Sequence, residues 1–143
     1  MAEEFPVVSL DSPALDAVNL LAGRRLPGLI VTDERGRPYS VLPASQVVRF
    51  LVPTYVQDDP SLARVIDESF ADRVADKLGG ATVRKLLPSA PMELPVVKHD
   101  DTVLEIAAIM ARLRCPLVVV TKNGEIIGAI TASRLLELAV APH

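Results

Sequence analysis

The chain has 143 residues, of which half are hydrophobic, and fifteen Lys and Arg against eighteen Asp and Glu give a formal net charge of −3. This length suits one ordinary domain or two very small ones packed together. Aromatic residues make up only 3% and Trp is absent, so the core must be built from Val, Leu, Ile and Ala. A nucleic-acid partner is not expected, because such proteins are usually basic and carry a stripe of Lys and Arg.

The single cysteine, Cys115, excludes an internal disulfide and suits a reducing compartment. The N-terminus, MAEEFPVV, lacks the basic and apolar regions of a signal peptide. No apolar run approaches the roughly 18 to 20 residues that span a bilayer. We therefore expect a cytoplasmic protein with no direct insertion into a membrane.

The first elements are predicted from helix-capping and turn-forming residues and from the spacing of the apolar residues. After the extended segment PVVS, Ser12 is expected to cap a helix that has Pro13 in its first turn. The apolar run LIVT is typical of a strand buried on both faces, and DERG is a hairpin signal. A second strand, PYSVL, and a closing helix, ASQVVRFLV, complete the unit.

A different piece follows. Residues 60–78 place their apolar residues on a narrow stripe, which predicts one amphipathic helix of about five turns that ends at Gly79-Gly80. We expect this helix to cover an exposed side of the fold or to meet its copy in a dimer. The next stretch, TVRKLLPSAPMELPVV, is rich in Pro and is expected to be extended.

The last part of the chain repeats the first. Thr102 and Glu105 have the spacing of a capping box, and a helical stripe, the strand LVVVT, an NG turn, the strand EIIGAI and the helix ASRLLELAV follow. This self-similarity predicts a tandem duplication, with units at 1–56 and 81–143 and the inserted helix at 57–80. Aligned identities include Asp11 with Asp100, Arg25 with Arg114, Pro27 with Pro116, Gly36 with Gly124, and Ala44-Ser45 with Ala132-Ser133.

A doubled unit with LPGLIV and CPLVVV before its hairpins resembles a tandem pair of CBS domains (a Bateman module). TVRKLLP is similar to the segment that commonly introduces such a domain, and GAITASRLL to its closing strand and helix. The resemblance implies an α/β (α+β) fold in which two helix–strand–strand–helix units pack as a pseudo-twofold disc with two clefts between them. It also implies a homodimer.

The family commonly binds AMP, ADP, ATP or S-adenosylmethionine in those clefts and passes the signal to an enzyme or transporter. Its last strand ends in Gly-x-x-Thr/Ser-x-x-Asp, where the hydroxyl faces phosphate and the Asp accepts both ribose hydroxyls. Neither repeat here has the carboxylate. The second repeat has Gly128, Thr131 and Arg134, and the first has Ser40, Pro43 and Gln46.

Two interpretations of Thr131, Ser133 and Arg134 remain open. In the first, a hydroxyl, the N–H groups at a helix start and a guanidinium converge on an anion such as phosphate. In the second, Thr131 caps the helix while Arg134 points to solvent or pairs with Glu137.

The resemblance assigns further residues to the clefts. Pro116 and Leu117 begin the strand beside Thr131, Lys98 ends the lead-in strand, and Gln46 offers an amide to a ribose or base in the first cleft. A solvated Lys98 is the alternative. Pro43 is expected to start a helix.

The other reactive residues favour structural roles. Cys115 aligns with Leu26 and is expected to be buried rather than redox-active. His99 is expected in a solvated loop, and no metal is required, because metal sites need more than one such ligand. No catalytic constellation is found, which predicts a protein that is not an enzyme.

Two functions follow. The first is a regulatory module that senses an adenine nucleotide or related adenosyl ligand between its units and signals to a separate enzyme or transporter. The alternative is a ligand-free module that docks on such a partner, which the missing carboxylates favour.

Overall fold

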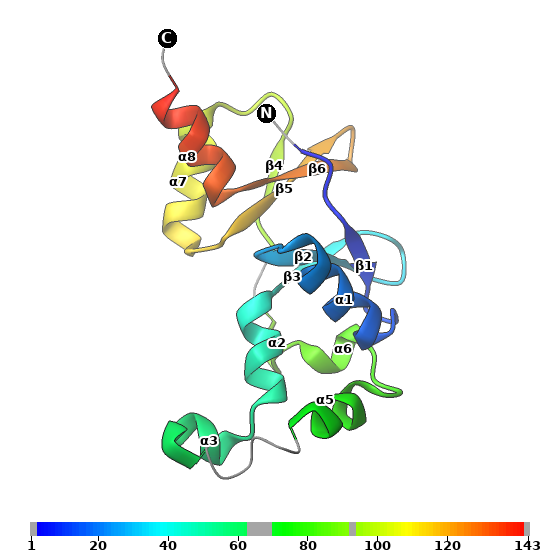
Figure 1. The fold of residues 1–143 in the computed structure, drawn as a ribbon. Helices are drawn as coiled ribbons and strands as arrows, with labels where there is room; N and C mark the ends of the chain where they lie inside the picture. The colour runs from blue at the N-terminus through cyan, green and yellow to red at the C-terminus, as the bar shows by residue number, and fades with distance from the viewer. Residues whose placement is uncertain (1–2, 63–69, 92–93, 142–143) are drawn as a thin grey trace.

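The structure is a computed structural model that describes residues 3–62, 70–91 and 94–141. Two units follow one another along the chain, each with a three-stranded sheet and two helices, and short helices lie between them (Figure 1). The predicted α/β class and the doubled unit are confirmed. The first unit comprises β1 (Val7–Ser9), α1 (Ala14–Arg24), β2 (Gly28–Thr32), β3 (Pro38–Pro43) and α2 (Ala44–Leu51), and the second comprises β4 (Val96–Lys98), α7 (Val103–Leu113), β5 (Leu117–Lys122), β6 (Glu125–Thr131) and α8 (Ala132–Val140).

The two units match in backbone detail as well as in order. In each, the lead-in strand pairs in parallel with the central strand, and the third strand pairs antiparallel to it. Both central strands shift register immediately before an equivalent threonine, Thr32 in β2 and Thr121 in β5. Arg25 and Arg114 each end the first helix of their unit in the left-handed conformation, with φ of 51°. The same register shift and the same left-handed residue occur in both units, which supports the duplication predicted from the sequence.

The two sheets pack face to face and share a buried layer. Ile30 and Val41 enter it from the first unit, and Leu117 and Val119 enter it from the second. Cys115 lies in the same layer and is 4% exposed. Burial raises the pKa of its thiol, which keeps the group protonated and unreactive. The prediction of a packing role for this cysteine is confirmed.

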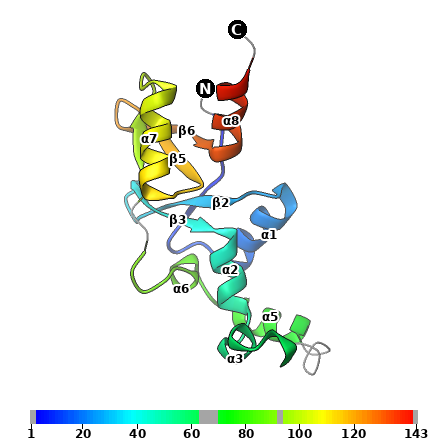
Figure 2. The same cartoon turned by 90° about the vertical axis from the view of Figure 1, so that its left-hand side faces the viewer.

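The helices lie on the outer faces of the two sheets (Figure 2). Beneath α1 and α2, Ala17, Leu29 and Leu42 are fully buried. Beneath α7 and α8, Ile106 and Ile130 are buried in the same way. Each unit is therefore a sheet whose inner face meets the other unit and whose outer face is covered by helices.

Of the caps predicted for the first helix of each unit, only that of the second unit is present. Thr102 Oγ1 accepts from the N–H of Glu105 at 3.2 Å, and the Glu105 carboxylate accepts from the N–H of Thr102, so the capping box is confirmed. The prediction for Ser12 is wrong. Its Oγ accepts from the N–H of Ser9 at 3.0 Å, and α1 begins one residue after Pro13, with no side-chain cap. The Ser12 hydroxyl accepts its hydrogen bond within the turn between β1 and α1, so it does not cap the helix.

The single helix predicted over residues 60–78 is confirmed at its C-terminal end, which stops before Gly79-Gly80, but its first three residues form a 3-10 turn. The described parts of this segment contain a short 3-10 turn (η1, Pro60–Leu62) and a helix, α5 (Phe70–Leu78), and residues 63–69 lie outside the described residues. A further short helix, α3 (Thr54–Asp58), precedes them. Helix α5 lies against α2, where Lys77 Nζ donates to the carbonyl of Phe50 at 2.8 Å and lies 5.3 Å from the centre of its ring. It therefore covers the first unit, which is one of the two predicted roles.

The extended conformation predicted for TVRKLLP is wrong. These residues form a short helix, α6 (Val83–Leu86), against α1. Both Val83 and Leu86 are fully buried, three positions apart on one side of the turn. Burial of this pair against the first unit overrides the weak local signal, and Pro88 follows the helix.

Candidate functional site

The start of α8 gathers several of the residues that the sequence predicts. Thr131 is the N-cap residue, and its Oγ1 accepts from the N–H of Arg134 at 3.2 Å. It pairs with Leu117 across β5 and β6, and the carbonyl of Pro116 accepts from the N–H of Ala132 at 2.9 Å. The predicted cap at Thr131 is confirmed. Strand β5 and helix α8 thus meet at one point, which brings Thr131, Pro116, Leu117, Ser133 and Arg134 into one neighbourhood.

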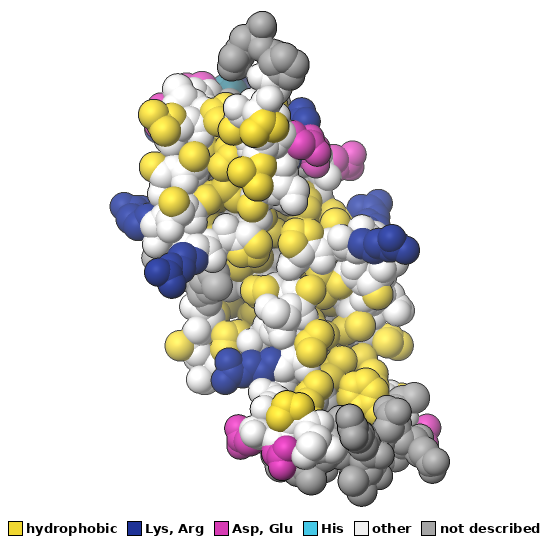
Figure 3. All heavy atoms as spheres, turned by 60° about the vertical axis from the view of Figure 1, so that its left-hand side comes forward, with side chains coloured by type: hydrophobic (Ala, Val, Ile, Leu, Met, Phe, Trp, Pro, Cys, Tyr) yellow, Lys and Arg dark blue, Asp and Glu magenta, His cyan; other side chains and the backbone are white. Residues whose placement is uncertain are grey.

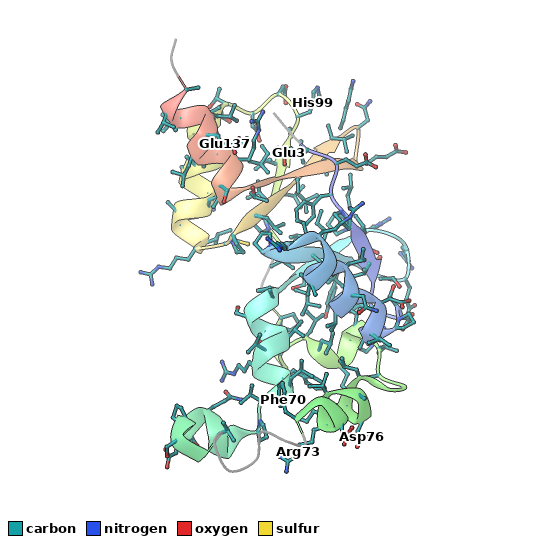
Figure 4. The ribbon with its side chains drawn as sticks, in the orientation of Figure 1. Glu3, Phe70, Arg73, Asp76, His99 and Glu137 are labelled. Atoms are coloured by element: carbon teal, nitrogen blue, oxygen red, sulfur yellow. The ribbon has the colours of Figure 1, made fainter. Side chains whose placement is uncertain are left out.

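Arg134 provides the charge of this neighbourhood, and two carboxylates surround it. Its Nη1 donates to Glu137 Oε2 at 2.9 Å, and its Nε lies 3.5 Å from Glu3 Oε1. Glu3 and Glu137 are labelled in Figure 4. The Nε atom is buried and has no hydrogen-bond partner among the described residues. The guanidinium is therefore neutralised by the carboxylates, but its hydrogen bonds are incomplete.

The carboxylate of Glu3 belongs to a segment that joins the two units. Glu3 exchanges two backbone hydrogen bonds with Ala129 of β6, at 3.0 and 2.9 Å. A few residues later the chain enters β1 in the sheet of the first unit. The ion pair between Glu3 and Arg134 therefore lies where the N-terminal segment crosses from one unit to the other.

The remaining predicted residues differ in accessibility, and Lys98 pairs with Thr121 at the other end of β5, away from Leu117 and Thr131. Ser133 and Lys98 are exposed, and the backbone N–H of Lys98 donates to Asp101 at 2.9 Å. Pro116 is half-buried. The side chain of Leu117 is fully buried between the sheets, so it offers no surface to a ligand.

Gln46 occupies the position of Arg134 in the first unit but has a structural partner. Its Nε2 donates to the carbonyl of Leu86 at 3.2 Å and so ties α2 to α6. Pro43 precedes α2 as the N-cap residue without a side-chain cap bond, as predicted. The two helix starts are therefore unequal, because only the second combines a capping hydroxyl with a cation in its first turn.

A cleft of about 830 Å³ that the sequence did not predict lies elsewhere. It lies between the β2–β3 hairpin of the first unit and strand β6 of the second, beside the N-terminal segment. Its lining carries two cations, Arg35 and Arg37, and two acids, Glu4 and Glu125. One sequence feature could have indicated this cleft. The first hairpin turns with the longer, charged stretch DERGRP, whereas the second turns with NG.

Asp33 fixes the hairpin that carries the two arginines. Its Oδ1 accepts from the backbone N–H groups of Arg35 and Arg37, at 2.9 and 3.0 Å. The Arg37 hydrogen bond is the largest influence that holds the pKa of Asp33 below its usual value, although partial desolvation opposes it. The Arg35 N–H and the two positive charges act in the same direction as the Arg37 bond.

No metal centre is found in the part of the chain that the structure describes. There, no group of three or more His, Cys, Asp or Glu side chains is placed to hold a metal ion. His99 is exposed in the turn after β4, as predicted. Within the described ranges, no helix combines the length and apolarity needed to cross a bilayer.

The chain thus folds as two copies of one unit whose sheets pack face to face, with a cleft between the two hairpins at one side of the contact. The chain matches the CBS domain family at residues 1–53 and again at 84–141. It belongs to the CBS domain family, whose members are regulatory modules. The tandem pair inferred from the sequence is thereby confirmed.

Solved structures show the same fold. A CBS domain-containing protein of unknown function from Kribbella flavida DSM 17836 is 83% identical, with a TM-score of 0.89 over 98% of this chain and 95% of its own. The CBS domain of a membrane protein from Sphaerobacter thermophilus is 18% identical, with a TM-score of 0.71 over 95% and 82%. CBSX2, solved in complex with AMP, is 20% identical, with a TM-score of 0.63 over 95% and 87%. None of the curated proteins matches the sequence.

Proposed function

We propose that this chain is a non-catalytic, cytoplasmic regulatory module that binds an adenine nucleotide or related adenosyl ligand beside Thr131 and signals to a separate enzyme or transporter. Candidate ligands are AMP, ADP, ATP and S-adenosylmethionine, and no metal is needed. The observation that carries the proposal is Arg134, whose buried Nε lacks a hydrogen-bond partner among the described residues at the start of a helix. The complex of the related fold CBSX2 with AMP supports this ligand class.

The proposed mechanism is an exchange of anions at Arg134. In the free protein the guanidinium contacts Glu3 and Glu137. A ligand phosphate would replace the longer of the two contacts, that with Glu3, and accept from the Nε that is now without a partner. Loss of the Glu3 contact would loosen the N-terminal segment where it crosses between the units. A ligand shifts a conformational balance in this way only if it binds the two arrangements with different affinity.

Isothermal titration of the full chain with AMP, ADP, ATP, S-adenosylmethionine and adenosine tests this function. We expect heat of binding with at least one phosphate-bearing ligand and weaker binding of adenosine. The substitution Arg134→Ala should weaken phosphate-dependent binding about tenfold or more, because charge-assisted hydrogen bonds contribute about 1.5–3 kcal/mol. Arg112→Ala, on the exposed side of α7, is the matched control and should leave binding unchanged. No heat with any ligand would reject the proposal.

We also propose that the module forms a homodimer through its helices. Apolar side chains are exposed at equivalent positions of the two repeats, Leu15 and Val48 in the first and Leu104 and Leu136 in the second. Helix α8 has no fully buried residue, and apolar side chains gather over the second unit in the upper half of Figure 3. An exposed apolar patch of this kind marks an interaction surface.

The occupant that we infer for this face is a second copy of the chain. The exposed stripe of α7 continues from Leu104 through Ala108 and Ala111, and Leu136 and Val140 follow on α8. These apolar positions recur at helical spacing on both helices, so a twofold contact of the face with itself would bury the same apolar stripe on each copy. The ligand-free interaction module is the alternative. Its signature would be a monomer in solution that forms a complex of fixed stoichiometry with an enzyme or transporter.

A further inference from the structure

A pocket of about 400 Å³ lies where helices α2, α5 and α6 meet. These helices lie toward the end of the molecule opposite α8 (Figure 1). The polar lining of the pocket comes from α5, from the turn that follows it and from α6: Asp76, Lys77, Gly80, Thr82 and Lys85. None of these residues lines the larger hairpin cleft between the two units, so the two hollows are separate.

Two lysines bring positive charge to this pocket without an acidic partner. Lys77 Nζ donates to the carbonyl of Phe50 at 2.8 Å, which uses one of the three hydrogens of its ammonium group. The side chain of Lys85 is exposed and makes no hydrogen bond to another described residue. In the described ranges neither lysine has a carboxylate within 4.0 Å, although Asp76 lines the same pocket. Both ammonium groups therefore have hydrogen-bond donors available to an anion.

The turn between α5 and α6 adds two uncharged donors. The N–H groups of Gly79 and Ala81 donate to carbonyls of α5, at 2.9 and 3.2 Å. The N–H of Gly80 between them has no partner among the described residues, and the same holds there for the Thr82 hydroxyl. Gly80 has a φ of 73°, which residues with a side chain rarely adopt. Because α6 has only four residues, its own dipole is small, and the charge of the pocket comes from the lysines.

We propose that this pocket binds a small hydroxylated phosphate ester of the sugar-phosphate class. Lys77 and Lys85 neutralise the phosphate as point charges, and the Gly80 N–H and the Thr82 hydroxyl donate to its oxygens. Four donors from three segments match the several oxygens of a phosphate better than the two of a carboxylate. Asp76 accepts hydrogen bonds from hydroxyl groups on the body of the ligand. The volume lies at the lower end of the range of small-molecule sites, which favours a ligand of this size.

A ligand in this pocket fastens the inserted helix α5 to the first unit. In the free protein, Lys77 and Phe50 connect α5 to α2, and Gln46 Nε2 donates to the carbonyl of Leu86 and connects α2 to α6. A phosphate held by Lys77 and Lys85 adds a direct connection between α5 and α6. The site therefore acts on the segment between the repeats, at a distance from the neighbourhood of Arg134.

Amide spectra of the full-length ¹⁵N-labelled protein, titrated separately with glucose 6-phosphate, glycerol 3-phosphate, glucose and inorganic phosphate, test this site. We expect the Gly79 and Gly80 amides to shift with at least one of the two esters and not with glucose. Inorganic phosphate should bind about fivefold more weakly, because it lacks the hydroxyl groups that Asp76 accepts from. No shift at either glycine with either ester would overturn the site. Equal binding of glucose or of inorganic phosphate would overturn the proposed ligand class.

The substitution Lys85→Glu should weaken this binding at least about tenfold, because it replaces an attraction to the phosphate by a repulsion. The backbone N–H of Lys85, which donates to the carbonyl of Thr82 at 3.0 Å, is kept, so α6 should still form. Lys122→Glu, at the exposed end of β5, makes the same change of charge elsewhere and is the matched control. Undiminished binding in Lys85→Glu, or an equal loss in Lys122→Glu, would overturn the proposal. Arg134→Ala should leave the glycine shifts unchanged, and their loss in that variant would place the phosphate at Arg134 instead and overturn the separate site.

Discussion

Arg134 Nε and Glu3 Oε1 lie 3.5 Å apart and connect the N-terminal segment to the closing helix of the second unit. Both side chains are partly exposed, at 34% and 56%, so the pair itself stabilises the fold by at most about 1 kcal/mol. Its importance lies in its position. Under the proposed function, the same guanidinium cannot hold Glu3 and a ligand phosphate equally well, so phosphate binding should weaken the attachment of the N-terminal segment.

The substitution Glu3→Gln should therefore raise the affinity for a phosphate-bearing ligand, by up to about fivefold. The change removes a negative charge that repels phosphate and frees one side of Arg134, and an exposed carboxylate pair contributes about this much. Titration calorimetry with AMP measures the effect. Asp16→Asn, an exposed acid on α1, removes the same charge elsewhere. Equal affinities for wild type and Glu3→Gln would contradict the exchange of anions at Arg134.

Two threonines at helix starts provide a test of capping. Thr102 accepts from the N–H of Glu105, whereas Thr82 precedes α6 without a side-chain cap bond. We expect Thr102→Ala to lower the free energy of unfolding by about 1 kcal/mol and Thr82→Ala to lower it by clearly less. Urea denaturation of both variants measures the difference. Equal losses would show that the capping box does not contribute as its geometry indicates.

Much of the fold could be predicted because the signals that specify it are local and occur twice. The two strands of each hairpin, the NG turn and the capping box at Thr102 are all specified by residues within the element or directly beside it. Helix α6 could not be predicted in this way. Its conformation depends on the burial of Val83 and Leu86 against the first unit, and four residues carry too little periodicity to indicate it.

The sites were harder to predict than the fold, because most of their contacts join residues that are far apart in the sequence. The cap at Thr131 and the pair of Arg134 with Glu137 are local, and both were anticipated as one alternative. The contact of Arg134 with Glu3 joins the two ends of the chain, and the hairpin cleft joins turns from different repeats. No spacing in the sequence reports such contacts.

Glycines at two positions should respond to the same substitution in opposite ways. A Cβ at Gly28 in β2 would lie 3.0 Å from the carbonyl oxygen of Leu42 and 3.3 Å from Cα of Pro43, and both neighbours are backbone atoms that cannot turn away. We expect Gly28→Ala to destabilise the protein by about 1–3 kcal/mol. At Gly23 in α1 a Cβ would meet nothing within 4 Å, so Gly23→Ala should be neutral or stabilise by up to about 1 kcal/mol. Thermal unfolding of the two variants would contradict this reasoning if Gly28→Ala were the more stable.

The hairpin at Asp33 should contribute to stability in a pH-dependent way. The pKa of Asp33 is lower in the folded protein than its usual value, so the folded state binds fewer protons at this group. Its contribution is therefore present above about pH 4 and is lost as the pH falls through the folded-state pKa. The difference in free energy of unfolding between wild type and Asp33→Ala should be largest at neutral pH and shrink below about pH 4. Asp100→Ala, at an exposed acid in the turn after β4, serves as the control. A difference for Asp33→Ala that is independent of pH would contradict the role of the carboxylate.

The proposed dimer makes a prediction about which apolar residues matter. Leu136 on α8 is 64% exposed and Ile127 on β6 is 46% exposed, so Glu can be placed at either position without opening the core. Figure 1 shows that α8 and the hairpin of β6 lie on different sides of the second unit. Leu136→Glu should convert the dimer to a monomer, because a twofold contact brings both introduced charges into one apolar interface. Ile127→Glu should remain dimeric. Light scattering after size-exclusion chromatography measures the mass of each variant, and a wild-type monomer, or a dimer that Leu136→Glu leaves intact, would reject the helix face as the contact.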